Sequence, residues 1–311
     1  MTLHNLQTGL STDIPLCQAR LPSSRTSEFT ALRFHEENNQ LTGGRFGYLQ
    51  GSGGGPSEDN VSGHLVRSVT TGWRPNSVLA VDAGTCLAGI IAVLERTESL
   101  KAISHVLPRE RRGSDRKTTA YSPFSDANLP YQTPRANAGH VLRELISTFL
   151  ITHSHLDHIS GMAIATAALK NLKNKKRIAG LSHTINSIRK HILNDVIWPN
   201  LSDEDGGVGL VTYMRIAEGA QQYVWVADGL SAQAWPISHG HCMKQNHFHK
   251  GSRAGTSHSS QTSDKAVATP CVIDSTTYFI KDEASQCELL MWGDVEPGKL
   301  HSSMVFVLLR Y

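Results

Sequence analysis

The stretch Thr152-His153-Ser154-His155-Leu156-Asp157-His158 brings together three imidazoles and a carboxylate, directly after an apolar run at residues 149–151. The apolar run predicts a buried strand, and the polar residues then fall on the loop at its end. His153 and His155 are two residues apart, so both can face one point, while Asp157 and His158 can serve a second point nearby. Imidazole and carboxylate suit zinc and similar ions, and two adjacent metal centres are typical of hydrolases. The stretch therefore predicts a metal site; the alternative is a histidine-rich surface loop.

The run Ser154-His155-Leu156-Asp157-His158-Ile159-Ser160-Gly161-Met162 resembles the signature of the class II (low-affinity, fungal-type) 3′,5′-cyclic-nucleotide phosphodiesterases. These enzymes are a branch of the metallo-β-lactamase fold superfamily. One His-x-His pair followed by one Asp-His pair would by itself indicate only the superfamily, which also includes lactamases, glyoxalase II and tRNA-processing nucleases. Leu156 and the Ile-Ser-Gly at 159–161 narrow the resemblance to the phosphodiesterases, as does a helix and loop at residues 191–202. The resemblance covers residues 46–298 and implies an α/β fold, the αββα metallo-β-lactamase sandwich.

This resemblance also implies the ligands of two divalent metal ions, with zinc the first expectation. The first ion would be held by His153, His155 and His239, the last from a Ser-His-Gly match at the end of a short strand. The second ion would be held by Asp157 and His158. Asp294, in the matching run Gly293-Asp294-Val295-Glu296-Pro297, would bridge the two ions, and the alternative for it is a carboxylate in a tight turn. Asp157 and Asp294 are the candidate catalytic carboxylates, and the implied reaction is hydrolysis of cAMP to the 5′-monophosphate.

Residues outside the ligand set receive supporting roles from the same resemblance. Asp82, at the end of the apolar run 78–81, would brace the metal loop through hydrogen bonds and would not bind metal itself. Candidate substrate-pocket residues lie in the family-like loop: Asn194, Trp198 and Asn200, with a place in the core as the alternative for Trp198. His191 and Asp195 are four apart on a predicted helix at 184–196, where an i,i+4 pair is favoured over a metal site.

Other segments carry weaker signals. A glycine-rich run at residues 51–56 follows a predicted strand at 46–49 and is either a tight hairpin turn or a backbone surface for phosphate. Further helices are expected at 87–94 and 160–169, and the polar residues 97–138 predict a long surface excursion with a solvated charge run at 109–112.

The composition of the chain limits the classes of partner that it is expected to bind. The chain has 311 residues, 30 basic and 27 acidic, and a net charge of +3, which gives no argument for a nucleic-acid or membrane partner. Five scattered cysteines without a C-x-x-C pair indicate free thiols in a reducing compartment. Without a targeting leader in the sequence, a cytoplasmic location is expected. The expected partner is a small-molecule cyclic nucleotide, and a homodimer is left open.

The predicted organisation is a flexible polar leader at 1–45 and a phosphodiesterase-like domain at 46–311, with a disordered insertion at 245–266. Family members continue past Pro297 to a final metal-binding histidine, whereas this sequence ends at Tyr311 and the flanks of His301 do not match. We therefore expect a sandwich truncated at its C-terminus, without its last strand, last helix and one ligand of the second ion. Two alternatives follow: a truncated, inactive metal-binding product, or a lactamase-fold hydrolase acting on a thioester or RNA.

Overall fold

The computed structural model describes residues 29–32, 58, 61–106, 123–124, 126–219, 222–245 and 268–295. Within these ranges the first sheet has the order β1-β2-β3-β4-β5-β6, with antiparallel pairs from β1 to β3 and parallel pairs from β3 to β6. Its strands are β1 Phe29–Leu32, β2 Gly63–Ser68, β3 Val78–Ala83, β4 Ile146–Leu150, β5 Lys176–Leu181 and β6 Val211–Ile216.

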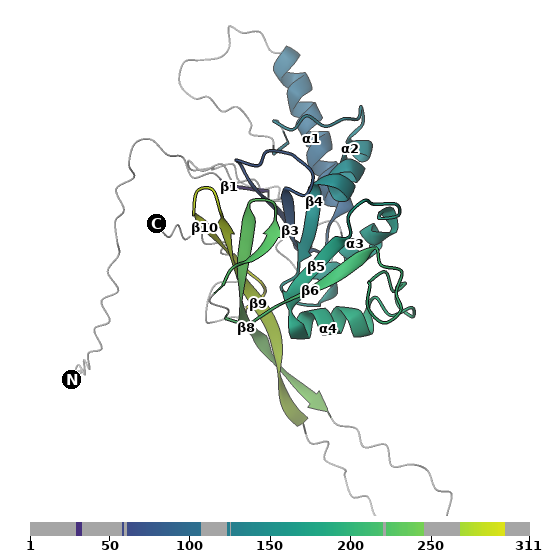
Figure 1. Ribbon diagram of the computed structural model, residues 1–311, viewed down its shortest axis with the longest axis vertical. Helices are drawn as coiled ribbons and strands as arrows, with labels where there is room; N and C mark the ends of the chain where they lie inside the picture. Colours follow the sequence, from purple (N-terminus) through teal and green to yellow (C-terminus); the bar gives the residue numbers. More distant parts are fainter. Residues whose placement is uncertain are drawn as a thin grey trace, which may run out of the picture.

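The second sheet is antiparallel throughout and has the order β10-β9-β8-β7. Its strands are β7 Val224–Ala227, β8 Leu230–Gln245, β9 Ala268–Asp282 and β10 Glu288–Trp292. β9 and β10 pair as an antiparallel hairpin, with Thr277 opposite Trp292 and Lys281 opposite Glu288. β8 is much longer than the short strand predicted before His239. Its far end pairs with β9 as a two-stranded arm that extends beyond both sheets (Figure 1).

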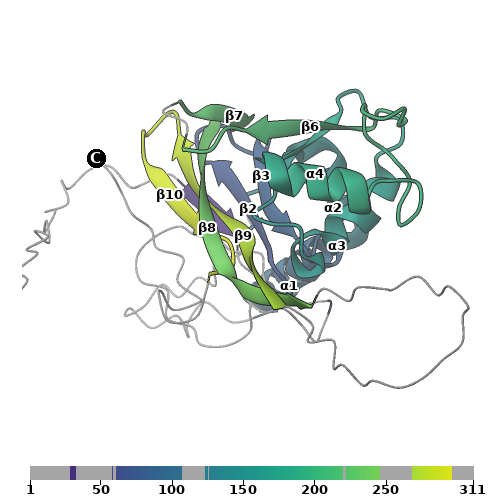
Figure 2. The ribbon, with the colours of Figure 1, turned by 90° about the horizontal axis from the view of Figure 1, so that it is seen from below.

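The helices are α1 Leu87–Val106, α2 Pro134–His140, α3 Leu156–Ala165 and α4 Ser182–His191, with a π-helical turn at Val141–Leu145 and a 3₁₀ turn at Thr166–Ala168. They cover one face of the first sheet, and the second sheet covers the other face (Figures 1 and 2). The described residues thus form three layers of the predicted αββα sandwich. In the described part of the chain, no helix lies on the outer face of the second sheet.

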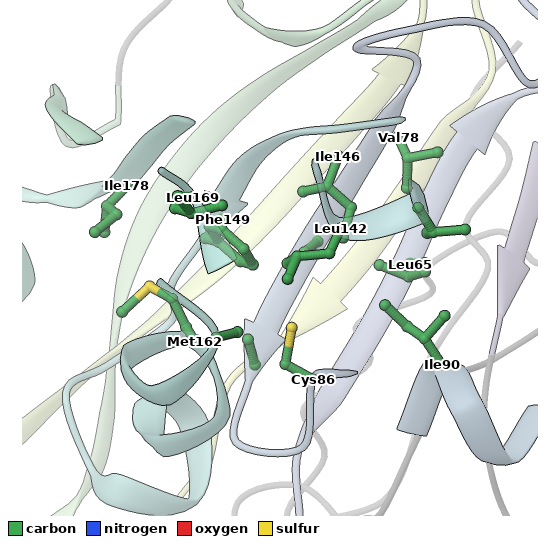
Figure 3. Packing of buried hydrophobic residues seen from close by; sticks show 14 of the residues in the cluster. Leu65, Val78, Cys86, Ile90, Leu142, Ile146, Phe149, Met162, Leu169 and Ile178 are labelled. Atoms are coloured by element: carbon green, nitrogen blue, oxygen red, sulfur yellow. The ribbon is translucent and has the colours of Figure 1, made fainter. Parts of the chain in front are cut away.

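Successive side chains of β3 point alternately to the two faces of the first sheet and contribute to a different apolar cluster on each face. Val78 and Ala80 belong to the apolar cluster beneath the helices, whereas Leu79 and Val81 belong to the cluster between the two sheets. Because side chains alternate along a strand, a strand buried on both sides needs apolar residues on both faces, as residues 78–81 provide. Side chains from the sheet and from the helices meet in the first cluster, where Met162 of α3 and Cys86 lie in the same layer as Phe149 (Figure 3).

Several element boundaries differ from the prediction. α1 continues to Val106, so the surface excursion predicted from residue 97 is partly helical; no glycine or proline interrupts residues 90–106. α3 begins at Leu156, directly after His155, whereas the prediction started it at residue 160. α4 ends at His191 because the chain turns back, with Trp198 N donating to Ile192 O and Asp195 at φ 64°.

Part of the predicted leader belongs to the first sheet. Phe29–Leu32 forms β1, which pairs with β2 in the register Phe29 to Ser68. These four residues, which the prediction assigned to the leader, are therefore an edge strand of the body. Other predictions fall outside the described residues: the strand at 46–49, the glycine run at 51–56, the charge run at 109–112, the insertion from residue 246 onward, and the C-terminal truncation after residue 295. Within the described ranges, none of the helices has the length and apolar character needed to cross a bilayer.

Candidate metal centre

The site forms where several strands of the two sheets end. β3 and β4 are parallel neighbours, so their carboxyl ends reach the same edge of the first sheet. Asp82 lies at the end of β3, and His153 follows β4 by three residues. Loop residues at the carboxyl ends of parallel strands gather at one edge, and this is where α/β sheets bind ligands. The predicted motif is therefore at the position from which its side chains can reach both sheets.

The start of α3 arranges the second half of the motif. His155 is the residue that precedes the first turn, and His158 N donates to His155 O at 3.0 Å. Asp157 and His158 therefore lie within the first helical turn, where a carboxylate is favoured by the helix dipole. His158 is buried, whereas Asp157 remains partly exposed.

His239 reaches the site because of an irregularity in β8. Ser238 pairs with Asp274 and Gly240 pairs with Ile273, so His239 is the extra residue of a β-bulge. Bulges change the direction of a side chain relative to the regular strand. Gly240 has a φ of 140°, a backbone conformation that a side chain would disfavour. The bulge brings His239 to the motif of β4: its ring lies 5.0 Å from the His153 ring and 5.1 Å from the His155 ring.

Asp294 follows β10 and places its two carboxylate oxygens on different histidines. Oδ1 lies 3.4 Å from His158 Nε2, and Oδ2 lies 3.3 Å from His239 Nε2. Donor atoms of His153, His155 and His239 lie within 4.8 Å of one another, and so do those of His153, His158 and Asp294. The structure thus brings together all six residues predicted as ligands, although Asp157 stands beside the second group, with Oδ2 3.5 Å from His158 Nε2.

These separations fit metal coordination. In a tetrahedral zinc site, ligand atoms about 2.0–2.1 Å from the metal are about 3.3 Å from one another. Four separations between these donor atoms lie close to that value, from 3.1 Å, between His153 Nε2 and His155 Nδ1, to 3.5 Å. Moreover, His158 Nε2 is buried and faces two carboxylates, with Asp294 Oδ1 at 3.4 Å and Asp157 Oδ2 at 3.5 Å. These contacts are long for charge-assisted hydrogen bonds and match the separation between two ligands of one metal ion.

The protonation states agree with this interpretation. Burial and the neighbouring His158 lower the pKa of His153 to about 3, and burial and His239 lower the pKa of His155. Burial alone would raise the pKa of Asp294, but its hydrogen bond to His158 and the nearby histidine charges lower it to about 2. Neutral imidazoles and ionised carboxylates are the forms that bind metal.

The pKa of His158 shifts in the opposite direction to the pKa values of His153 and His155. Burial lowers its pKa, but the charge of Asp82 and hydrogen bonds to Asp157, Asp294 and Asp82 outweigh burial and raise the pKa well above its usual value. A positive charge on this ring balances the surrounding carboxylates. The site therefore calls for a cation at this position, and a divalent ion meets that requirement when the ring is neutral.

Sequence and structure comparisons assign the family. A family model described as class-II cAMP phosphodiesterases matches residues 74–306. The chain belongs to this family. A 3′,5′-cyclic-nucleotide phosphodiesterase of Schizosaccharomyces pombe is 25% identical over 256 residues, which cover 82% of this chain and 59% of the relative. A probable 3′,5′-cyclic-nucleotide phosphodiesterase of Yersinia pestis is 28% identical over 190 residues, covering 61% of this chain and 46% of the relative.

The crystal structure of unliganded yeast PDE1 has a similar fold, with a TM-score of 0.51 and 20% identity over 83% of this chain and 67% of that chain. Together with the order of the layers, this confirms the predicted metallo-β-lactamase-type α/β fold. The chain spans about half the length of the curated relatives that it matches, at 59% and 46% for the two named above.

The family-specific loop after α4 uses its polar groups to hold its own shape. Asn194 Oδ1 accepts hydrogen bonds from the backbone N–H groups of residues 196 and 197, and Asn200 Nδ2 donates to Glu204 O. Trp198 packs against the core beneath the helices, and its Nε1 donates to Thr166 Oγ1 at 3.0 Å. The carboxylate of Asp195 accepts from Asn200 N, and α4 ends before it, so His191 and Asp195 do not share a helix.

Asp82 braces the metal loop in the predicted way. Its Oδ1 accepts from Thr152 N at 2.8 Å, and its Oδ2 lies 2.8 Å from His158 Nδ1. Two further residues, for which the sequence predicted no such role, complete this bracing. Thr152 adds its hydroxyl to the network, and the hydroxyl of Tyr278 donates to Ile151 O at 2.6 Å. The threonine adjoins the motif and could have been suspected, whereas no sequence signal connects Tyr278 with residue 151.

Proposed function

We propose that this chain hydrolyses 3′,5′-cyclic nucleotides, cAMP first among them, to 5′-nucleoside monophosphates, using two divalent metal ions of which zinc is the best candidate. The observation that carries the proposal is the carboxylate of Asp294, with one oxygen beside His158 and the other beside His239. A carboxylate shared in this way supports two adjacent ions, and two-metal sites suit the displacement of an alkoxide from a phosphate. Family membership narrows the substrate to cyclic nucleotides.

The residues divide into two ligand groups. His153, His155 and His239 would hold one ion, and Asp157 and His158 would hold the other, with Asp294 between them. When bound, two such ions acidify a water molecule and neutralise charge on the phosphoryl oxygens. Imidazole nitrogens with carboxylate oxygens favour zinc over magnesium or calcium, which prefer oxygen ligands alone.

Two ionised carboxylates border the place where the phosphate would react. The reaction joins a water oxygen to phosphorus and breaks the bond between phosphorus and the 3′-oxygen, which takes up a proton. A hydrogen bond from His158 is the largest influence that lowers the pKa of Asp157, and Asp294 is ionised as well. Either carboxylate can therefore accept the proton of the attacking water before that proton reaches the leaving oxygen.

We also propose that the loop carrying Asn194, Trp198 and Asn200 forms one wall of the substrate pocket. Support for this comes from the family resemblance of residues 191–202 and from the exposed side chains of Val196 and Ile197 at its tip. The internal hydrogen bonds of the loop favour a role in shaping the wall for all three named residues. A cytoplasmic location and a homodimer also belong to the proposal, and cell fractionation and light scattering test them.

The test combines metal analysis with hydrolysis by the purified chain. We expect two zinc ions per chain and release of 5′-AMP from cAMP, measured by chromatography. The His153→Ala variant should lose the ion held by the three histidines, and hydrolysis with it, because His153 is one of the three imidazole ligands of that ion. The His191→Ala variant is the matched control: this histidine is exposed at the end of α4, and its removal should change neither result.

Other outcomes point to the alternatives. Bound metal without turnover of cAMP or cGMP, but with cleavage of a thioester or of RNA, would favour a lactamase-fold hydrolase with another substrate. Bound metal with no turnover of any of these would favour a metal-binding product without activity. Absence of bound metal in the folded chain would contradict the proposal altogether.

A further inference from the structure

The hydroxyl of Thr152 lies at the centre of a buried network beneath the metal site. It is 2.9 Å from Asp82 Oδ2 and 3.1 Å from Asp82 Oδ1. The same oxygen lies 3.1 Å from His153 Nδ1 and 3.4 Å from His158 Nδ1. Thr152 has no exposed surface. One side chain therefore contacts a ring from each half of the metal motif and the carboxylate that braces them.

The proton arrangement follows from the hydrogen-bonding capacity of each group. A threonine hydroxyl has one proton to donate and two lone pairs to accept with. Because the carboxylate of Asp82 only accepts, the Thr152 proton points to it, and the hydroxyl then accepts from His153 Nδ1. His158 Nδ1 in turn donates to Asp82 Oδ2 at 2.8 Å. Both rings thus use Nδ1 in the network, which leaves Nε2 of each ring to face the metal positions.

We infer that Thr152 is a positioning residue whose hydroxyl fixes the ring orientation of His153, and through Asp82 that of His158, and so sets the metal affinity of the site. The inference rests on the proposed metal site and deepens it. Groups that orient ligands in this way change metal affinity by about 10–100-fold when removed. Thr152 contacts the ligands and not the reacting atoms, so its effect must reach the reaction through the metal.

The fold holds Thr152 in place independently of its hydroxyl. Its backbone N–H donates to Asp82 Oδ1, a bond that any side chain at this position retains. Its Cβ packs against Gly293, where an added methyl group would come within 2.7 Å of it. The preceding carbonyl, of Ile151, accepts from Tyr278. A Thr152→Val substitution therefore keeps the shape and the backbone bond and removes the hydroxyl alone.

The experiment measures zinc affinity by competition with a chromogenic chelator, and the melting temperature of the metal-free chain. We expect Thr152→Val to bind zinc about 10–100-fold more weakly and Thr152→Ser to bind it like the unmodified chain. The control is Thr148→Val, on β4, the strand that leads to Thr152: Thr148 is equally buried and donates to Val226 O, away from the site. This control should lower the melting temperature and leave zinc affinity unchanged. Should Thr152→Val fail to fold, Thr152→Ala and Thr152→Ser make the same comparison.

The results separate this inference from the proposed function. Zinc binding by Thr152→Val within twofold of the unmodified chain would overturn the inference and leave the metal site standing. Equal losses of zinc affinity in Thr152→Val and Thr148→Val would also overturn it, because general destabilisation would then be the cause. An unmodified chain that binds no divalent ion would overturn the metal site and the inference together.

Discussion

Asp82 and His158 are joined by a buried contact of 2.8 Å between Oδ2 and Nδ1, although 76 residues separate them in the chain. Both side chains are at most 4% exposed. A carboxylate that accepts from the far nitrogen of a ligating imidazole orients the ring and makes its other nitrogen a better metal ligand. Asp82 holds this place with a φ of 53°, in the left-handed region that aspartate tolerates better than most residues.

The Asp82→Asn variant tests this contact. The amide removes the charge, and its N–H₂ meets a donating group at either oxygen position: Thr152 N–H at Oδ1, or the Thr152 hydroxyl and His158 Nδ1 at Oδ2. We expect zinc affinity to fall by about 10–100-fold, measured by chelator competition on the folded variant.

Asp228→Asn provides the control for that loss of charge. Asp228 pairs with Arg74 on the surface, so its replacement should leave zinc affinity unchanged and alter stability by less than about 1 kcal/mol. Unchanged zinc binding in Asp82→Asn would show that the contact does not influence the metal.

Gly84 allows the loop after β3 to lie against the backbone of the metal loop. A Cβ at this position would overlap the carbonyl of Asp157, and Gly161 N donates to Gly84 O at 2.8 Å. Because the obstacle is backbone, it cannot move aside without displacing the ligands. We expect Gly84→Ala to lower the free energy of unfolding by about 1–3 kcal/mol in urea titration and to weaken zinc binding.

A glycine with free space is the matched control. Gly139, in α2, has no atom within 4 Å of an added Cβ. Gly139→Ala should therefore be neutral or stabilise the chain by up to about 1 kcal/mol. Similar unfolding free energies for both alanine variants would contradict the proposed close packing at residue 84.

Tyr278 connects the second sheet to the strand that carries the motif. Its buried hydroxyl donates to Ile151 O at 2.6 Å, one residue before Thr152. Tyr278→Phe should reduce the free energy of unfolding by about 1 kcal/mol, because the carbonyl loses a donor inside the protein. Tyr131→Phe, at a side chain that is 54% exposed, should have no measurable effect. Equal stability of both phenylalanine variants would rule out a contribution from the hydroxyl.

The burial of Lys176 leads us to expect that the stability of the chain depends on pH. Its ammonium group donates to Arg143 O at 2.6 Å and to Ile146 O, and burial lowers its pKa from 10.5 to about 8. Between these two values the unfolded chain binds more protons at this residue than the folded chain. Raising the pH through this window therefore stabilises the folded state, by at most about 1.4 kcal/mol per pH unit.

The measurement compares the unmodified chain with Lys176→Met by urea unfolding at pH 7, 8.5 and 10. Titrations common to both chains cancel in the difference between their unfolding free energies. The unfolding free energy of the unmodified chain minus that of Lys176→Met should therefore increase as the pH rises. A difference that stays constant across the range would show that the folded and unfolded pKa values of Lys176 agree.

The metal motif was predictable because its geometry is local. His153, His155, Asp157 and His158 are neighbours in the chain, and one strand end followed by one helical turn places them together. Helix and strand ends were less predictable where tertiary contacts decide them. α4 stops at His191 although the apolar pattern continues, because residues 192–200 form their own hydrogen-bonded turn. β1 lacked a sequence signal of its own, since a four-residue edge strand depends on its pairing with β2.

By itself the sequence determined the family, the layered α/β fold and the identity of the six candidate ligands, since these depend on residue types at short spacings and on apolar runs. Only the tertiary structure decided how they meet. It placed Asp294 between His158 and His239, turned His239 inward by a bulge, and assigned Thr152 and Tyr278 to the network below. The physical reason is distance along the chain: contacts between residues 55 to 136 positions apart arise from sheet register and packing, which no local pattern encodes.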